Sequence, residues 1–377
     1  MNSPSVSIRL NPFKGCDGPE GSPVPWSPYG RILQERPVFT LDPLFHAGCY
    51  YVQDSSAMFV GHVFREHLPE KGPVKVLDLC AAPGGKTTDL AASLRERYGD
   101  AFLLVSNEVM KARAGVLNDN VALWGDPNVV VTSADPAAFG RMPGYFDVIV
   151  ADVPCSGEGM FRKDPRAEAE WSESVVELCS ARQRRILADV WPALKEGGVL
   201  VYSTCTYEDS ENDGNLLWAA EELGGEIFVP SDEFASSGVR TTRAGNLLKA
   251  GEVPGEGQWA GALRRTSACT GRKGGIRLED LRPLRSGVVK GEWKGKDFIP
   301  DPDWALSLSF DRGAYPEAGV DRETALHFLH RDAVVLPDSP SGYNVITYRG
   351  HPLGFVKNLG KRCNNLHPQR RRILMDI

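Results

Sequence analysis

The middle of the chain alternates short apolar runs with longer amphipathic segments, and this alternation constrains the fold more than any other feature. The amphipathic segments have helical spacing, whereas the runs are rich in β-branched residues and apolar throughout. Such runs indicate parallel strands that helices bury on both faces. The five runs are VKVLDL (74–79), AFLLVSNEV (101–109), NVVVTSAD (128–135), FDVIVADVPC (146–155) and VLVYSTC (199–205). We therefore predict an α/β fold with a doubly wound, mostly parallel sheet over residues 50–266.

The segments on either side of this region differ from it in character. Residues 1–49 are rich in proline and glycine and contain one strand-like piece, SVSIRL, which predicts a small accessory extension. Residues 267–296 are glycine-rich and basic, which is typical of a linker. Residues 297–377 contain short strand-like pieces separated by turn residues, as expected for a small β-rich domain.

The composition excludes several classes of protein. With 42% hydrophobic and 24% charged residues, the chain has an ordinary globular composition. No apolar run reaches the length of a membrane-spanning helix, and the N-terminus lacks the apolar core of a signal peptide. We expect a cytoplasmic monomer without membrane contact. The net charge of −6 means that any nucleic-acid contact must come from a local basic face.

The eight cysteines are scattered, with no C-x-x-C pair and no matching histidine spacing. They are Cys16, Cys49, Cys80, Cys155, Cys179, Cys205, Cys269 and Cys363. This pattern favours buried cysteines or reactive thiols over a zinc site or a disulfide framework. We therefore expect neither a metal centre nor disulfide bonds.

The loop after the first run, CAAPGGKT, lies where an open parallel sheet binds ligands, at the carboxyl end of a strand. Its glycines allow close approach of the backbone to a ligand. The loop has neither the G-x-G-x-x-G spacing nor that of a P-loop, which argues against a pyrophosphate ligand. The predicted cofactor-binding residues of this loop are Cys80, Ala81, Ala82, Pro83, Gly84, Gly85 and Lys86.

One acidic residue lies at the predicted strand end within each of the next three runs. Glu108 could accept hydrogen bonds from ribose hydroxyls, Asp135 could meet an adenine amine, and Asp152 ends the fourth run. Together with the glycine loop, this set predicts a pocket for S-adenosylmethionine. The alternative is that each acid only caps the helix that follows it.

Two cysteines lie at the ends of neighbouring strands, Cys155 in DVPC and Cys205 in STC. A pyrimidine C5 carbon becomes nucleophilic only after a thiolate adds at C6, so a thiol beside a methyl-donor pocket favours C5 methylation. Asp152 would stabilise the charge that develops on the ring. Chemistry alone leaves open which cysteine attacks, and a single cysteine at a strand end can also be a buried core residue.

Four motifs, YYVQDSSAM, CAAPGGKT, DVPCSGEGMFRKDP and STCTYEDSEND, together resemble the Nol/Nop/Sun family of RNA cytosine-C5 methyltransferases over about residues 6–266. The resemblance implies a Rossmann-like domain that uses S-adenosylmethionine. It also implies that Cys205 is the covalent nucleophile and that Cys155 assists product release. Lys86 would serve both the cofactor loop and the active site, and Arg113 would hold the adenosine end.

The tail resembles the PUA-like RNA-binding module of the RsmF-like bacterial enzymes, which methylate small-subunit ribosomal RNA. The resemblance implies that the partner is ribosomal RNA or the small ribosomal subunit, and not DNA. Basic residues suited to phosphate contact are Lys357, Lys361, Arg362, Arg370, Arg371 and Arg372 in the tail, and Arg182, Arg184 and Arg185 before the last run. A solvated charged face is the alternative for the tail, and one arginine of the second group could be paired inside the protein.

Three other functions compete with methylation of a cytosine in 16S ribosomal RNA. A transfer-RNA cytosine-C5 methyltransferase would use the same chemistry. A non-catalytic RNA-binding ribosome-assembly factor would not need both thiols. An amino methyltransferase would carry Asn or Asp before Pro-Pro and an aromatic residue, where this chain has DVPC. Asp213 stands where a glutamate is common in the family. Because of this departure, the resemblance does not predict the substrate groove or the target site.

Overall fold

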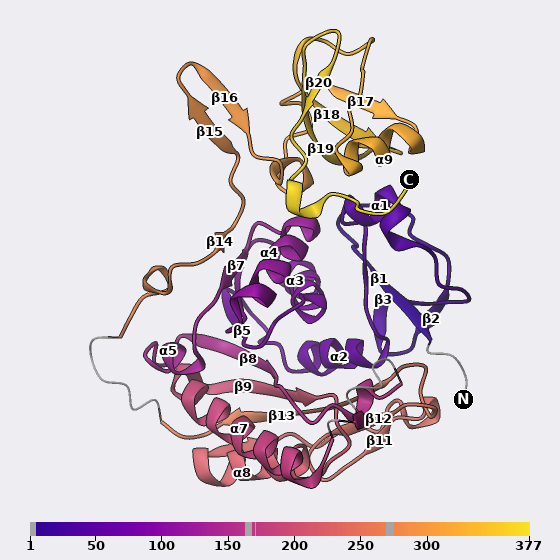
Figure 1. Cartoon of the computed structure of the whole chain (residues 1–377). Helices are drawn as coiled ribbons and strands as arrows, with labels where there is room; N and C mark the ends of the chain where they lie inside the picture. Colours follow the sequence, from indigo (N-terminus) through magenta and orange to yellow (C-terminus); the bar gives the residue numbers. More distant parts are fainter. Residues whose placement is uncertain (1–4, 163–167, 170, 269–274) are drawn as a thin grey trace.

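The computed structural model describes residues 5–162, 168–169, 171–268 and 275–377. A ten-stranded sheet forms the centre of the molecule, with a smaller sheet formed by the N-terminal segment and another by the C-terminal segment (Figure 1). The strands of the central sheet are β5 (Val74–Asp78), β6 (Phe102–Asn107), β7 (Val129–Thr132), β8 (Phe146–Asp152), β9 (Leu194–Thr204), β10 (Gly225–Ile227), β11 (Arg240–Thr241), β12 (Asn246–Lys249), β13 (Gly257–Arg265) and β14 (Arg285–Ser286).

The strand order fixes where a ligand can bind. The order is β11-β12-β13-β9-β8-β5-β6-β7-β14, with β10 paired to β13. The strands from β7 to β9 are parallel, and the chain moves from β5 to β6 on one side but places β8 on the other. The crevice outside the carboxyl ends of β5 and β8 is therefore the switch point at which open sheets bind ligands.

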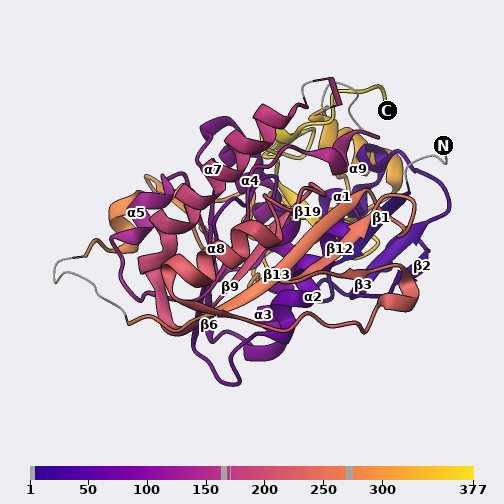
Figure 2. The same ribbon diagram turned by 90° about the horizontal axis from the view of Figure 1, so that it is seen from below.

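Alternate residues of the parallel strands face two layers of helices. Val148 and Val150 belong to the core on one side, and Ile149 and Ala151 to the core on the other. The first core includes α2 (Phe59–Glu66), α3 (Gly85–Tyr98) and α4 (Lys111–Trp124), and the second includes α5 (Pro136–Gly140), α7 (Glu173–Val190) and α8 (Asp213–Leu223). Figure 2 shows α7 and α8 on one side of β13 and α2 and α3 on the other. The predicted doubly wound α/β sheet is confirmed.

The N-terminal segment forms a four-stranded antiparallel sheet with the order β2-β3-β1-β4. Its elements are β1 (Val6–Leu10), β2 (Ser22–Val24), β3 (Ser27–Leu33), α1 (Pro43–His46) and β4 (Tyr50–Val52). Tyr50 is opposite Leu10 across the β1–β4 pair. The predicted start of the central region, residue 50, therefore lies on a strand of the N-terminal sheet.

The C-terminal segment forms a second small sheet, β17-β18-β19-β20, in which β17 and β18 are parallel. Its elements are β17 (Glu317–Val320), α9 (Arg322–His330), β18 (Gly342–Tyr348), β19 (His351–Asn358) and β20 (Cys363–Asn365). A separate hairpin, β15 (Gly291–Lys294) and β16 (Asp297–Pro300), projects beside this sheet (Figure 1). Within the stretch predicted as a linker, β14 pairs with β7, which ties the stretch to the central sheet.

The expectation that no disulfide forms is wrong for one pair. Cys16 and Cys49 are bonded, and they are 33 positions apart in the sequence. β1 and β4 are adjacent strands, and this adjacency, which spacing alone does not reveal, brings the two cysteines together. Cys269 lies outside the described residues, and the other five cysteines are free thiols. None of the described helices combines the length and the apolar character needed to span a membrane.

Candidate active site

The cofactor loop is shaped by a glycine and held by two side chains from α4. Gly84 has a φ of 116°, a left-handed conformation that favours glycine. Arg113 donates from Nη2 to the carbonyl oxygen of Ala82 at 2.8 Å, and Asn120 donates to that of Pro83 at the same distance. The loop is therefore preorganised by the protein itself.

The first residues of the loop face the protein interior. The backbone N–H of Ala81 donates to the carbonyl oxygen of Asn107 at 2.8 Å. Burial raises the pKa of the Cys80 thiol well above its usual range, so this thiol is uncharged at neutral pH. Cys80 thus has a packing role in the loop and is not a second nucleophile.

Asp78, at the end of β5, is a candidate site residue that the sequence motifs did not predict. It is fully buried, and Thr87 donates a 2.6 Å hydrogen bond to its Oδ2. Its Oδ1 has no hydrogen-bond partner among the described residues. Burial raises the pKa of this carboxyl to about 7. A buried acid after an apolar strand, directly before a glycine loop, was the signal available in the sequence.

The acids that follow β6 and β7 differ in their surroundings. Glu108 is buried; its Oε1 accepts from the backbone N–H of Met110 at 2.9 Å, and its Oε2 lies 3.3 Å from Nη1 of Arg113. Arg113 therefore links Glu108 to the cofactor loop. The Oδ1 of Asp135 caps α5 by accepting from Ala137 N at 3.0 Å. This contact is the helix cap predicted as the alternative to cofactor binding.

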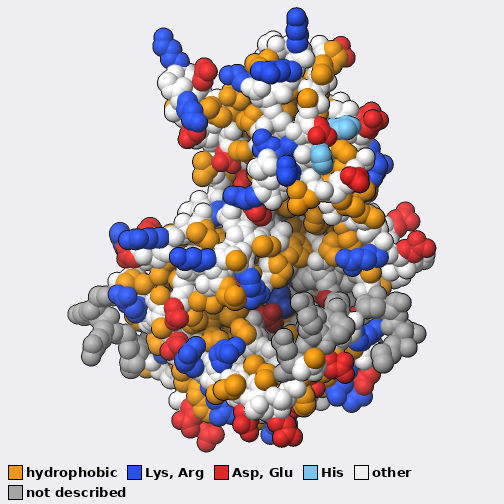
Figure 3. Space-filling view, viewed as in Figure 1, with side chains coloured by type: hydrophobic (Ala, Val, Ile, Leu, Met, Phe, Trp, Pro, Cys, Tyr) orange, Lys and Arg blue, Asp and Glu red, His pale blue; other side chains and the backbone are white. Residues whose placement is uncertain are grey.

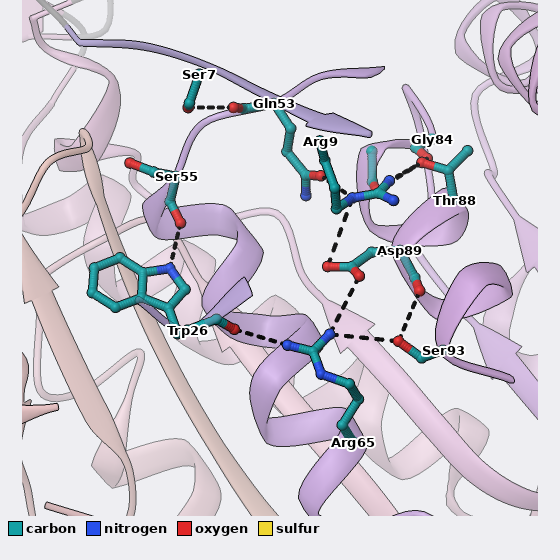
Figure 4. A network of polar contacts seen from close by, with 11 residues as sticks. Ser7, Arg9, Trp26, Gln53, Ser55, Arg65, Gly84, Thr88, Asp89 and Ser93 are labelled. Carbon is teal, nitrogen blue, oxygen red and sulfur yellow. Dashed lines mark hydrogen bonds and ion pairs between the residues drawn. The ribbon is translucent and has the colours of Figure 1, made fainter. Parts of the chain in front are cut away.

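Arg9, in β1 of the N-terminal sheet, contacts the start of α3. The sequence motifs did not predict this residue. This side chain is fully buried. It donates from Nε to Oε1 of Gln53 at 2.9 Å and from Nη2 to the carbonyl oxygen of Gly85 at 3.1 Å, and it also contacts Thr88 (Figure 4). Asp89 lies between Arg9 and Arg65. The N-terminal segment thus helps to hold the cofactor loop.

Three side chains from different elements orient Asp152, at the end of β8. Its Oδ2 lies 2.8 Å from Nζ of Lys86, while its Oδ1 accepts from Oγ of Ser203 at 2.8 Å and from Nε2 of Gln258 at 3.2 Å. Burial disfavours the charge on Lys86, but Asp152 more than offsets this effect and raises the lysine pKa. The ammonium is thus retained next to the carboxylate. Gln258 was not predicted, because it lies in β13, a strand outside the recognised motifs.

The two predicted cysteines meet. The Sγ atoms of Cys155 and Cys205 are 3.1 Å apart, and the backbone N–H of Cys205 donates to Sγ of Cys155 at 3.3 Å. The hydrogen bond from Cys155 lowers the pKa of Cys205, and the Lys86 ammonium acts in the same direction against burial and Asp152. The same hydrogen bond raises the pKa of Cys155, as does burial. Cys205 is therefore the thiol that ionises first.

The loop after β8 holds the backbone around Cys205. Glu158 accepts from Oγ1 of Thr206 at 2.8 Å and from the backbone N–H of Tyr207 at 2.7 Å. The N–H of Gly159 donates to the carbonyl oxygen of Cys205 at 2.8 Å, and a Cβ on Gly159 would come within 2.8 Å of that oxygen. The glycine and the glutamate of the SGEGM sequence thus serve one purpose, which is to fix the Cys205 loop.

Three family models match the chain in sequence order. They are the N-terminal domain of 16S rRNA methyltransferase RsmF over residues 1–55, 16S rRNA methyltransferase RsmB/F over residues 67–220, and the methyltransferase RsmF PUA domain over residues 316–373. The ribosomal RNA small subunit methyltransferase F of Salmonella typhi is 36% identical over 434 residues, covering 97% of this chain and 88% of the relative. The chain belongs to the RsmF family.

Family membership confirms the resemblance seen in the motifs and the tail. The protein is an RNA methyltransferase that uses S-adenosylmethionine and acts on ribosomal RNA, and its C-terminal module is a PUA domain. The competing interpretation as a non-catalytic assembly factor is thereby set aside.

Two solved structures share the methyltransferase fold. A methyltransferase homologue from Pyrococcus horikoshii has a TM-score of 0.58 at 25% identity, covering 70% of this chain and 87% of its own. NSun6 from Pyrococcus horikoshii, solved with the S-adenosylmethionine analogue SFG, has a TM-score of 0.57 at 19% identity, covering 70% of this chain and 92% of its own. These matches confirm the Rossmann-like fold.

Not all the basic residues predicted to contact RNA are available to it. The Arg371 side chain is only 7% exposed and is paired with Asp303, so the prediction that it contacts phosphate is wrong. Arg184 donates to Oδ1 of Asn215 at 2.8 Å and lies over the Trp218 ring, and it is the inward arginine that the sequence left open. Arg370 is exposed but pairs with Asp119 at 2.5 Å. The other exposed members of the two groups are Arg182, Arg185, Lys361, Arg362 and Arg372.

Two groups of described residues could hold a metal ion. They are Cys16, Cys49 and His351 in one group, and His62, Glu66 and Glu233 in the other. Neither group contains a residue of the site around Asp152 and Cys205. In the first group, moreover, the two sulfur atoms are bonded to each other.

Proposed function

We propose that the enzyme methylates C5 of a cytosine in 16S ribosomal RNA through a covalent bond between Cys205 and C6 of the base. The observation that carries the proposal is the pair of thiols 3.1 Å apart at the ends of β8 and β9, beside the Lys86–Asp152 ion pair. Methylation of a nitrogen needs no thiol, because the nitrogen lone pair can attack the methyl group directly. A pyrimidine carbon does need one.

The residues at the switch point suit S-adenosylmethionine, which supplies a methyl group on a sulfonium cation. The free Oδ1 of buried Asp78 and the carboxylate of Glu108 present acceptors, which suit hydroxyl groups and positive charge. A phosphate would instead need donors and positive charge. We propose that the loop 80–86, Glu108, Arg113, Asp135 and Asp152 hold this cofactor.

The reaction begins when the Cys205 thiolate adds to C6 of the cytosine and the electron pair of the C5=C6 bond moves to C5. Lys86, through Asp152, supplies a proton to N3, which neutralises the negative charge that the addition places on the ring, and N3 returns this proton after methylation. S-adenosylmethionine held beside the base would supply the methyl group that C5 accepts, with its sulfur as the leaving group. Loss of the C5 proton to a base restores the double bond and expels Cys205 as a thiolate.

Cys155 is suited to the last step for an electrostatic reason. Its pKa is raised first by the hydrogen bond with Cys205 and also by the charge of Cys205. Once Cys205 is bonded to carbon, its sulfur carries no charge, so these two effects disappear and Cys155 loses its proton more easily. We propose that Cys155 assists release of the methylated product.

Bisulfite sequencing of RNA from cells with and without the gene tests the proposal. We expect one cytosine in 16S ribosomal RNA to lose its C5 mark. A lost mark in transfer RNA alone would identify the competing substrate. Methylation of 16S ribosomal RNA at a nitrogen, detected by mass spectrometry of digested RNA, would contradict the C5 chemistry.

A further inference from the structure

The β15–β16 hairpin has no role in the site described above. Its two strands pair only with each other among the described residues, and residues 291–300 lie between the ranges that the family models match. A two-stranded hairpin is marginally stable in water unless it packs against something else. Phe298 supplies this packing, because its ring contacts Trp304 in the body of the protein and Trp293 within the hairpin.

Trp293 is unusual among the large side chains of this protein. It is 71% exposed, although its indole is among the largest apolar groups that a fold can bury. Its ring centroid lies 5.3 Å from that of Phe298, in an edge-on arrangement that fixes the indole. Most of the indole is thus presented to solvent, on a hairpin that projects from the molecule (Figure 1).

Basic residues lie along the hairpin and on the β19–β20 turn. We call this surface the hairpin face: Trp293 with Lys290, Lys294, Lys296, Lys357, Lys361 and Arg362. Lys357 of β19 links the C-terminal sheet to the hairpin, because its Nζ lies 3.7 Å from Oδ2 of Asp297 in β16. Lys294 also contacts Glu292 at 3.3 Å. Six cations against three carboxylates, of which Asp301 beside Lys290 is the third, give a positive face on a chain of net charge −6, and Figure 3 shows Lys and Arg side chains on both projections at this end.

We propose that the hairpin face binds single-stranded ribosomal RNA outside the active site, with Trp293 stacked on an unpaired base and the lysines on the neighbouring phosphates. An exposed aromatic ring among cations is the combination that single-stranded nucleic acid requires. The inference rests on the proposed ribosomal RNA substrate, which is large enough to contact both the active site and the hairpin.

The test compares Trp293→Ala, Trp293→Phe and the control Val229→Ala, which truncates another exposed apolar residue. Affinity for naked 16S ribosomal RNA is measured by filter binding, and kcat and KM by methyl transfer. We expect Trp293→Ala to raise the Kd and KM about tenfold without changing kcat. Trp293→Phe should retain most of the affinity, since it keeps a stacking ring.

A second variant tests the lysines independently of the hairpin's packing. Lys294→Gln with Lys296→Gln should flatten the slope of log Kd against log salt by about 0.7 for each phosphate that the protein no longer neutralises. Lys71→Gln, an exposed lysine elsewhere, should not change the slope.

The outcomes separate this inference from the proposed function. Unchanged Kd and slope in the hairpin variants would overturn the inference while leaving C5 methylation intact. Weaker binding in an enzyme that proves not to methylate C5 would support the hairpin face and overturn the proposed reaction. A loss of affinity for the assembled subunit but not for naked RNA would overturn the inference in favour of a ribosomal protein.

Discussion

The carboxyl edge of the central sheet has two halves that are built differently. In the cofactor half, after β5 and β6, the acids are held by neighbours in sequence: Thr87 donates to Asp78 from 9 positions away, and Met110 to Glu108 from 2. In the reaction half, after β8 and β9, Asp152 accepts from residues 51 and 106 positions away, Ser203 and Gln258. Local sequence therefore holds the acids of the cofactor half, although Arg9 and Arg113 hold its loop from further away, and sheet order specifies the reaction half.

Substitutions in the two halves should therefore behave differently. A change in the cofactor half alters one local contact and should affect cofactor affinity alone. A change in the reaction half removes one member of a network that several strands share. The loss of activity from one such change can exceed the contribution of the deleted contact alone. Five substitutions test this division, from the reaction half to the cofactor half.

The largest effect is expected from Cys205→Ala. Without the thiolate, C5 does not become nucleophilic, so methyl transfer should be abolished. Binding of S-adenosylmethionine, measured by calorimetry, should remain at the wild-type level. Cys179→Ala, which removes a buried thiol from α7, is the control and should stay active. Residual C5 methylation by Cys205→Ala would show that the reaction half has a different nucleophile.

Cys155→Ala should also stop turnover, but at a later step. The Cys205 adduct can still form, and its release is impaired. A covalent protein–RNA species should therefore accumulate and be visible as a shifted band on a denaturing gel. Wild-type turnover in this variant would remove Cys155 from the mechanism.

Lys86→Met should lower kcat/KM at neutral pH by roughly 100-fold. The ammonium lowers the pKa of Cys205, so its removal raises that pKa. Because the thiolate is the reactive form, the acidic limb of the pH profile should move to higher pH. An unchanged limb would mean that Lys86 does not influence Cys205.

Gln258→Leu should reduce kcat about tenfold, because Asp152 loses one of the donors that orient it and the carbonyl oxygen of Thr204 loses its partner. Cofactor affinity should not change. Gln34→Leu, which replaces an exposed glutamine directly after β3, serves as the matched control. Weaker binding of S-adenosylmethionine by Gln258→Leu would contradict the division between the two halves.

Glu108→Gln should have the smallest effect. Replacing a charged acceptor by a neutral one should weaken S-adenosylmethionine binding about fivefold, with kcat unchanged at saturating cofactor. Calorimetry and saturation kinetics measure the two quantities separately. A fall in kcat would show that Glu108, like the Lys86–Asp152 ion pair, couples the two halves.

The same division explains what the sequence could predict. The five parallel strands, the glycine loop and the acids at strand ends are local patterns, and the structure has them where they were expected. Gln258 and Arg9 were missed because each contacts the site from a strand distant in sequence, β13 or β1. Their partners follow from strand pairing, which one sequence does not specify.

The edges of the central sheet were the least predictable part. β14 pairs with β7 through two residues, a length too short for hydrophobic periodicity to show. The pairing of Cys16 with Cys49 likewise depends on the antiparallel β1–β4 register. By contrast, Cys155 and Cys205 were predicted to meet at the active site because each follows a continuous apolar run that indicates a parallel strand.

The first and last segments of the chain share one hydrophobic core. Ile8 and Leu44 belong to the same cluster as Leu326, Phe328 and Ile346. A ribosome releases the N-terminal end first, so the N-terminal sheet exists for most of synthesis without the residues that cover its apolar side. This core closes only after the last strand has been made. The PUA domain thus supports the cofactor loop at a distance, because it packs against the sheet that carries Arg9.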